Sequence, residues 1–131
     1  MKQTVKNIVV EEKDIDGLNH VNNSVYLNYL EHGREAWYME HAGYSYDDFH
    51  KANLGTAVLR IDIMYKKEAV LHDNLRVVTT PEKLGNTSFV FEQKILDEKD
   101  EEVCVATITK VMIDFTTRKS RKVIKEIARN F

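Results

Sequence analysis

One amphipathic stretch, residues 24 to 41, constrains the fold more than any other part of the chain. Within it Tyr26, Leu30, Gly33 and Trp37 recur at spacings of four, three and four residues, which is the period of one face of an α-helix. At 1.5 Å per residue this stretch predicts a helix about 27 Å long, enough to cross a small domain. Gly33 lies inside the apolar stripe, where glycine costs about 1 kcal/mol relative to alanine. We therefore expect a sheet to pass close to the helix at Gly33, at a distance that a Cβ would not permit.

The rest of the chain is patterned mainly as β-strands. A short second helix is expected over residues 46 to 52, because Ser45 and Asp48 have the spacing of a capping box, and Gly43 is expected to end the first helix. Strands are predicted at residues 5–11, 56–66, 74–80, 88–96 and 103–115, with turns at 84–86 and 97–100. The last dozen residues suit a short basic helix or a mobile tail. The order β-α-β-β-β-β predicts an α+β fold, one long helix against an antiparallel sheet of about five strands, in a single domain over residues 1–131.

Composition narrows the class of protein and its partners. With 43% hydrophobic and 31% charged residues the chain reads as globular, and a net charge of −2 gives no overall attraction to nucleic acid or to an anionic membrane. The single cysteine, Cys104, excludes an intramolecular disulfide and is expected to be a small buried apolar residue. We see neither a secretory signal nor an apolar run long enough to span a membrane, so the cytoplasm is the default location.

The segment that precedes the long helix, residues 14 to 23, is unusually rich in groups that can do chemistry. It carries two carboxylates, one imidazole and three carboxamides. Asp16 is a candidate general base or nucleophile toward an activated acyl carbon. The backbone N–H groups around Asn23 and Ser24 have no partner inside the helix and are candidates to hold the negative charge that develops on a carbonyl oxygen. The segment therefore predicts an active site.

Structural roles for the same residues remain open at this point. Asp16 has the position of a helix cap or dipole partner, and Asn22, Asn23 and Ser24 are all capping residues. His20 is a candidate acid/base, or a histidine that packs and holds the loop. The five histidines are scattered and no cysteine cluster exists, so no metal site is expected, and phosphate loops and dinucleotide fingerprints are absent. No cofactor is predicted.

The sequence from Asp16 to Glu31, with His-Val-Asn-Asn followed by Tyr-Leu, resembles the signature of hotdog-fold acyl-CoA thioesterases of the 4-hydroxybenzoyl-CoA thioesterase type. The family helix continues to an arginine, here Arg34. Residues 63–69, 71–75 and 84–89 are similar to later family segments, in the order that the fold requires. Two positions depart from the family, since Glu68 replaces a proline and His72 replaces a glycine.

The resemblance implies a hotdog fold, in which the antiparallel sheet wraps the long helix, and homodimers or homotetramers with the active site between subunits. It implies that Asp16 is the catalytic carboxylate, that the Asn23 N–H polarises the thioester carbonyl, and that no metal takes part. Further residues are predicted to act in catalysis or to contact the substrate: His20, Asn22, Ser24, Tyr26, Glu31, Lys66 and Lys67. The two lysines, or the basic tail at residues 118–125, are candidates to contact the CoA phosphates.

The leading hypothesis is an acyl-CoA thioesterase that releases an apolar free acid and CoA. An acyl-ACP thioesterase on the same site is an alternative. A second alternative is a non-catalytic hotdog protein that binds an acyl ligand or a protein partner. A hydratase or dehydratase on this fold is disfavoured, because no second acid/base is convincingly paired with His20.

Overall fold

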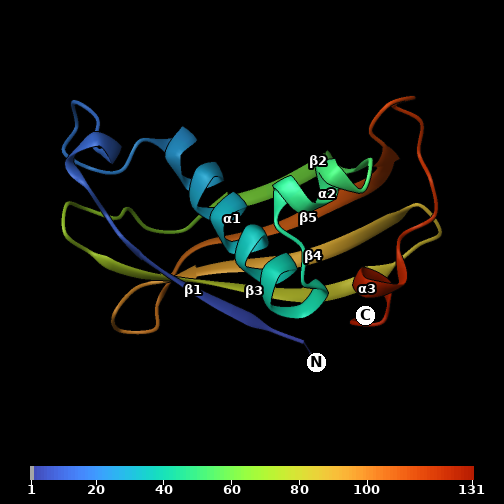
Figure 1. Ribbon diagram of the computed structural model, residues 1–131. Coiled ribbons are helices and arrows are strands. Elements are labelled where there is room, and N and C mark those ends of the chain that lie inside the picture. The colour runs from blue at the N-terminus through green and yellow to red at the C-terminus, as the bar shows by residue number, and fades with distance from the viewer. Residues whose placement is uncertain (1) are drawn as a thin grey trace.

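The structure is a computed structural model that describes residues 2–131, and it is built on one antiparallel sheet (Figure 1). The strands are β1 (Thr4–Val9), β2 (Leu54–Tyr65), β3 (Asn74–Leu84), β4 (Ser88–Leu96) and β5 (Glu102–Asp114). Their order in the sheet is β1-β3-β4-β5-β2, so that β1 and β2 form the two edges. The five-stranded α+β arrangement predicted from the sequence is confirmed.

The long helix α1 (Asn23–Trp37) lies across one face of the sheet, as Figure 1 shows. It continues into a π-helical turn, η2 (Tyr38–Ala42), and the helical segment ends at Gly43, whose φ of 75° is left-handed. A Cβ built on Gly33 would lie 2.5 Å from Val77 Cγ1 and 2.9 Å from Gln93 Nε2, both on the sheet. The predicted close approach at Gly33 is therefore confirmed.

The apolar core lies between α1 and the sheet in two clusters. The first surrounds the amino-terminal half of α1 and includes Tyr26, Leu30 and the buried Cys104. The second surrounds its carboxyl end, where Trp37 packs edge-on against Phe91 with ring centroids 4.8 Å apart. Together the clusters fix the position of α1 on the sheet, and with it the position of the polar loop that precedes the helix.

The shorter elements lie close to the positions predicted from the sequence. The exception is the end of strand β3. The helix α2 (Tyr46–Lys51) begins at the predicted capping box of Ser45 and Asp48, η1 (Glu12–Asp14) is a single 3-10 turn after β1, and α3 (Lys125–Ala128) lies in the tail. Strand β3 runs four residues beyond the predicted end at Thr80. A register shift between Pro81 and Lys83 accommodates the proline, which cannot donate a ladder hydrogen bond.

No helix in the described part of the chain, residues 2–131, has the length and hydropathy needed to cross a bilayer.

Candidate active site

The polar loop before α1 folds back on itself and is closed by a β-bridge. Ile15 and Val21 form the bridge, and inside it the N–H of Asp16 donates to the carbonyl of His20 over 3.0 Å. Asn19 turns the chain with a left-handed φ of 63°, a conformation that asparagine tolerates better than most residues. The loop thus places Asp16 directly opposite His20, and His20 lies three residues before the start of α1.

The loop is anchored to the rest of the protein at both sides. The N–H of Val21 donates to the carbonyl of Ala69 over 2.9 Å, in the segment that joins β2 to β3. On the other side Asp14 is buried, and its Oδ2 accepts from the Tyr29 hydroxyl at 2.8 Å and from the Glu11 N–H at 3.0 Å. Asp14 is therefore committed to holding the loop, which leaves Asp16 as the carboxylate available for chemistry.

The Asp16 side chain is half-buried and partly oriented by its own loop. Its Oδ1 accepts from the N–H of Leu18 over 2.8 Å. No residue in the range 2–131 donates to Oδ2. One carboxylate oxygen is thus held in place, and the other is free to meet a water or a substrate atom.

At the start of α1, Asn22, Asn23 and Ser24 differ in the hydrogen bonds that they form. Asn22 is the N-cap, and its Oδ1 accepts from both the N–H and the hydroxyl of Ser24, at 3.0 and 2.8 Å. The N–H of Asn23 has no acceptor among the described residues. Asn23 therefore presents the free donor that was predicted at this helix end, while the Ser24 N–H is already occupied.

His20 has a defined tautomer because of its neighbour. Its Nδ1 lies 3.0 Å from the carbonyl oxygen of Val21, which can only accept, so Nδ1 carries the hydrogen. In the neutral ring Nε2 is then the basic nitrogen. His20 is half-buried, and its ring bond to the Val21 carbonyl helps to hold the loop.

The other residues predicted to contact substrate lie in different settings. Tyr26 is buried in the core, its hydroxyl accepts from the N–H of Ala69 over 3.0 Å, and burial raises its pKa. Lys66 and Lys67 each form a 2.7 Å ion pair, with Glu102 and Asp97 respectively. Both lysines follow the end of β2, which the Tyr65 hydroxyl joins to the carbonyl of Asn23 at 3.2 Å, so they stand at the same end of the sheet as the loop.

The turn after β2 contains His72, one of the two residues that depart from the family pattern. His72 adopts a left-handed φ of 72°, the conformation that the family glycine supplies at no steric cost. Its N–H donates to the carbonyl of Val10 over 3.1 Å. The turn after β2 is therefore joined to the chain at Val10, directly after β1.

Sequence reasoning missed a pocket that begins one helical turn after Asn23. It has a volume of about 550 Å³, lies between α1, α2 and the β2–β5 edge, and includes Glu31 together with two buried cations, Arg34 and Lys110. The available signal was a lysine at position 110, in register with the buried Ala106, Ile108 and Met112 along β5. Within residues 2–131 no cluster of histidine, cysteine and acidic side chains is arranged to hold a metal ion.

A long helix held against one antiparallel sheet is the hotdog fold, and the carboxylate and free amide near the start of the helix fit the class of thioester hydrolases with this fold. Comparison with known proteins agrees. The family profile described as Thioesterase-like superfamily matches residues 10–131. The long-chain acyl-CoA thioesterase FadM of Escherichia coli (strain K12) is 33% identical over 114 residues, covering 86% of this chain and 85% of that protein.

Solved structures give the same result. The probable thioesterase YbaW from Escherichia coli is 30% identical, with a TM-score of 0.78 over 99% of this chain and 96% of the other. The DHNA-CoA thioesterase from Staphylococcus aureus is 23% identical, with a TM-score of 0.86 over 93% of this chain and 81% of the other. The chain belongs to the thioesterase-like superfamily and is a thioester hydrolase.

Proposed function

We propose that this protein hydrolyses acyl-CoA thioesters with an apolar acyl chain, and that Asp16 and the Asn23 N–H carry the reaction. The proposal rests on two features of one short segment: a carboxylate held by the loop at Asp16, and an unoccupied amide at Asn23 where α1 starts. The family and the acyl-CoA thioesterase FadM support the substrate class. The apolar walls of the pocket that begins at Leu27 support the nature of the acyl chain.

In the proposed reaction the thioester carbonyl oxygen lies against the Asn23 N–H. As a general base, Asp16 takes a proton from water, and the water oxygen adds to the carbonyl carbon while the Asn23 N–H holds the negative charge on the oxygen. Collapse of this adduct breaks the C–S bond, and the sulfur leaves as a thiolate that takes up a proton. His20, with Nε2 free, is the proposed proton carrier.

As a nucleophile, Asp16 instead bonds to the acyl carbon, expels the thiolate and forms an anhydride that water then hydrolyses. After one turnover in water enriched in heavy oxygen, label in Asp16 would identify the anhydride route, whereas label in the acid alone fits either a general base or attack of water on the acyl carbonyl of the anhydride. A general base sends the label only to the released acid, whereas attack of water on the Asp16 carbonyl of the anhydride leaves the label in Asp16.

The CoA portion is proposed to lie along the end of β2, where Lys66 and Lys67 stand. Each lysine already has a carboxylate partner, at 2.7 Å in both cases. A phosphate would therefore share the ammonium group with that carboxylate. The basic segment at residues 118–125 lies in the tail after β5 and is the alternative contact.

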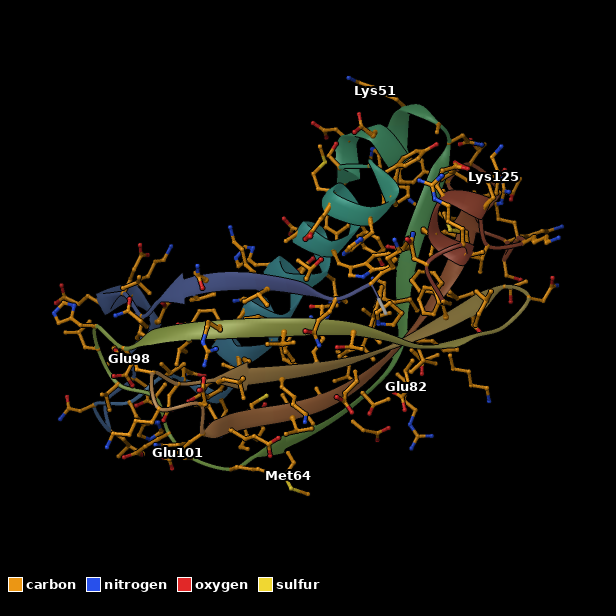
Figure 2. The ribbon with its side chains drawn as sticks, turned by 90° about the horizontal axis from the view of Figure 1, so that it is seen from below. Lys51, Met64, Glu82, Glu98, Glu101 and Lys125 are labelled. Atoms are coloured by element: carbon orange, nitrogen blue, oxygen red, sulfur yellow. The ribbon has the colours of Figure 1, made fainter. Side chains whose placement is uncertain are left out.

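We further propose that the protein forms a homodimer through β2. Within residues 2–131 this strand pairs with β5 alone, so its outer edge is unpaired. It carries exposed apolar side chains, and Met64 points outward from this edge in Figure 2. A long apolar edge strand is a site for pairing with another chain. Sedimentation of wild type and Leu59→Lys tests this, because a charge at the 66% exposed Leu59 should shift a dimer to monomers.

The decisive experiment is thiol release from a panel of acyl-CoA esters by wild type and Asp16→Asn. We expect kcat to fall by at least about 100-fold, as expected for loss of a general base or nucleophile. Asp47→Asn, an exposed carboxylate on α2, is the matched control and should retain wild-type rates. Equal rates for Asp16→Asn would remove Asp16 from the mechanism.

The same panel separates the alternatives. Thermal stabilisation by acyl-CoA without turnover would identify a non-catalytic acyl-binding protein. Faster release from acyl-ACP than from the matching acyl-CoA would identify the carrier protein as the natural donor. An acyl-ACP preference would leave the roles of Asp16 and Asn23 unchanged.

A further inference from the structure

The pocket beside α1 has the size and position of an acyl-binding site. Its volume of about 550 Å³ lies within the range of small-molecule sites, roughly 300–1,000 Å³. It begins at Leu27, one helical turn after the free amide of Asn23, and extends toward α2. Most of its wall is apolar, including Leu27, Phe49, Leu54, Val58, Ile61 and Ile113.

Three cations line this apolar wall; Arg118 is exposed, and the other two are buried. Arg34 and Lys110 line the pocket, and each is only 3% exposed. Burial and the Arg34 charge lower the pKa of Lys110 to about 7, while Glu31 acts in the opposite direction. Two basic side chains have thus been brought together in a largely apolar cavity.

The described part of the chain supplies no carboxylate partner for either cation. Arg34 donates from Nη1 to Gln93 Oε1 at 3.0 Å, but its buried Nε has no acceptor. No carboxylate within residues 2–131 lies within 4.0 Å of the Arg34 or Lys110 nitrogens, and Lys110 makes no side-chain hydrogen bond there. Glu31 is exposed and stands at the side of the pocket.

Such an arrangement is costly unless a ligand completes it. Buried charges in proteins are normally paired and hydrogen-bonded, and an unpaired one costs several kcal/mol. The Lys110 ammonium nitrogen retains contact with the open space of the pocket, whereas the Arg34 Nε has none. An anionic group inside the pocket would pair with Lys110 and satisfy the Nε of Arg34.

We propose that Arg34 and Lys110 bind a carboxylate at the far end of the acyl chain, so that the preferred substrates are CoA esters of dicarboxylic acids. This inference rests on the proposed function and specifies its substrate class. The apolar wall would hold the methylene chain, and the two cations would bind the terminal carboxylate. Arg34 lies three helical turns beyond Asn23, about 16 Å along the axis, so short diacids such as malonyl or succinyl would not span the pocket.

The test compares two CoA esters of equal chain length, dodecanoyl-CoA and dodecanedioyl-CoA, which differ only in the methyl or carboxylate end. For wild type we expect a higher kcat/KM with the dicarboxylic ester. Lys110→Met keeps the length of the side chain and removes its charge. It should lower the ratio of the two kcat/KM values by at least about tenfold, equivalent to 1.4 kcal/mol, and Lys110→Arg should restore the ratio.

Lys83→Met removes an exposed lysine from β3 and is the matched control, for which the ratio should equal that of wild type. The inference is overturned if wild type prefers the methyl-ended ester, or if Lys110→Met lowers both values equally. In either of these cases an Asp16-dependent rate with dodecanoyl-CoA would leave the proposed function intact.

Binding measured by calorimetry keeps the inference testable without turnover. Asp16→Asn, which should not hydrolyse the esters, is titrated with each ester, with and without the Lys110→Met change. Tighter binding of dodecanedioyl-CoA that depends on Lys110 supports the inference, even if neither ester is hydrolysed by wild type and the proposed function fails. Equal binding of the two esters overturns it.

Discussion

Gln93 in β4 accepts a hydrogen bond from Arg34 in α1, with Oε1 and Nη1 3.0 Å apart and both residues buried. The same amide donates from Nε2 to the carbonyl of Leu30 at 2.9 Å and to the Thr79 hydroxyl at 2.8 Å. Gln93 is thus the polar link between the middle of α1 and the sheet. It also holds Arg34 at the wall of the pocket, so that one side chain serves both the fold and the site.

Gln93→Leu is expected to lower the free energy of unfolding by at least about 2 kcal/mol, because it leaves the buried Arg34 without its acceptor. Urea denaturation measures the loss. The double variant with Arg34→Met should be less destabilised than the sum of the two single variants, because the charge that needs the acceptor has gone. Strictly additive losses would show that the hydrogen bond contributes nothing.

Gly33→Ala should destabilise the protein by about 1–3 kcal/mol, in spite of the higher helix propensity of alanine. The new methyl group would meet Val77 Cγ1 at 2.5 Å, and Val77 is fully buried and cannot move aside. Thermal and urea unfolding measure the effect. Gly17→Ala is the matched control, because a Cβ there meets nothing within 4 Å. A Gly33→Ala protein as stable as wild type would mean that α1 lies farther from the sheet.

We expect the two loop carboxylates to have different roles, Asp14 in stability and Asp16 in catalysis. Tyr29→Phe removes the hydroxyl that donates to the buried Asp14 and is expected to cost about 1–2 kcal/mol of unfolding free energy. Asp16→Ala removes a half-buried group whose only side-chain hydrogen bond among residues 2–131 lies within its own loop, and should change the melting temperature little while abolishing activity. Melting curves and thiol-release rates on the same samples check both statements. Loss of stability without loss of activity in Asp16→Ala would reverse the assignment.

Much of this architecture follows from local patterns in the sequence. The apolar stripe with Gly33 predicted both the helix and its contact with the sheet, because a buried glycine in a helix needs a close neighbour. The capping box at Ser45 and Asp48 predicted the start of α2 for a similarly local reason. The predicted end of β3 at Thr80 was wrong, because the strand continues through Pro81 with a bulge that depends on its pairing with β4.

Some features of the candidate site could likewise be predicted from the sequence and others could not. The polar loop could be recognised from composition and resemblance, but not which asparagine caps α1 and which leaves its N–H free, since this depends on side-chain conformation. The position of Lys110 among the apolar residues of β5 was a signal in the sequence, but the pocket that it forms with Arg34 could not be predicted. The two residues lie on elements far apart in the sequence, and only the packing of α1 over β5 brings their charges together.

Lys110 should make the stability of the protein depend on pH. Its pKa is lowered from 10.5 to about 7, first by burial, then by the Arg34 charge, with Glu31 opposing. Between these two values the unfolded chain binds more protons at this site than the folded one, so this residue favours folding increasingly as the pH rises from 7 toward 10.5. Below pH 7 the folded protein must hold the full buried charge. Lys110→Met lacks this penalty.

We therefore expect Lys110→Met to be more stable than wild type at about pH 6, by about 1–4 kcal/mol, and the advantage to shrink steadily as the pH is raised toward 10. Urea unfolding of both proteins across this range measures the difference. Lys83→Met, whose lysine is exposed, should show no such trend. An advantage that stays constant with pH would mean that Lys110 is charged to the same extent in the folded and unfolded states, and that the pocket is open to water.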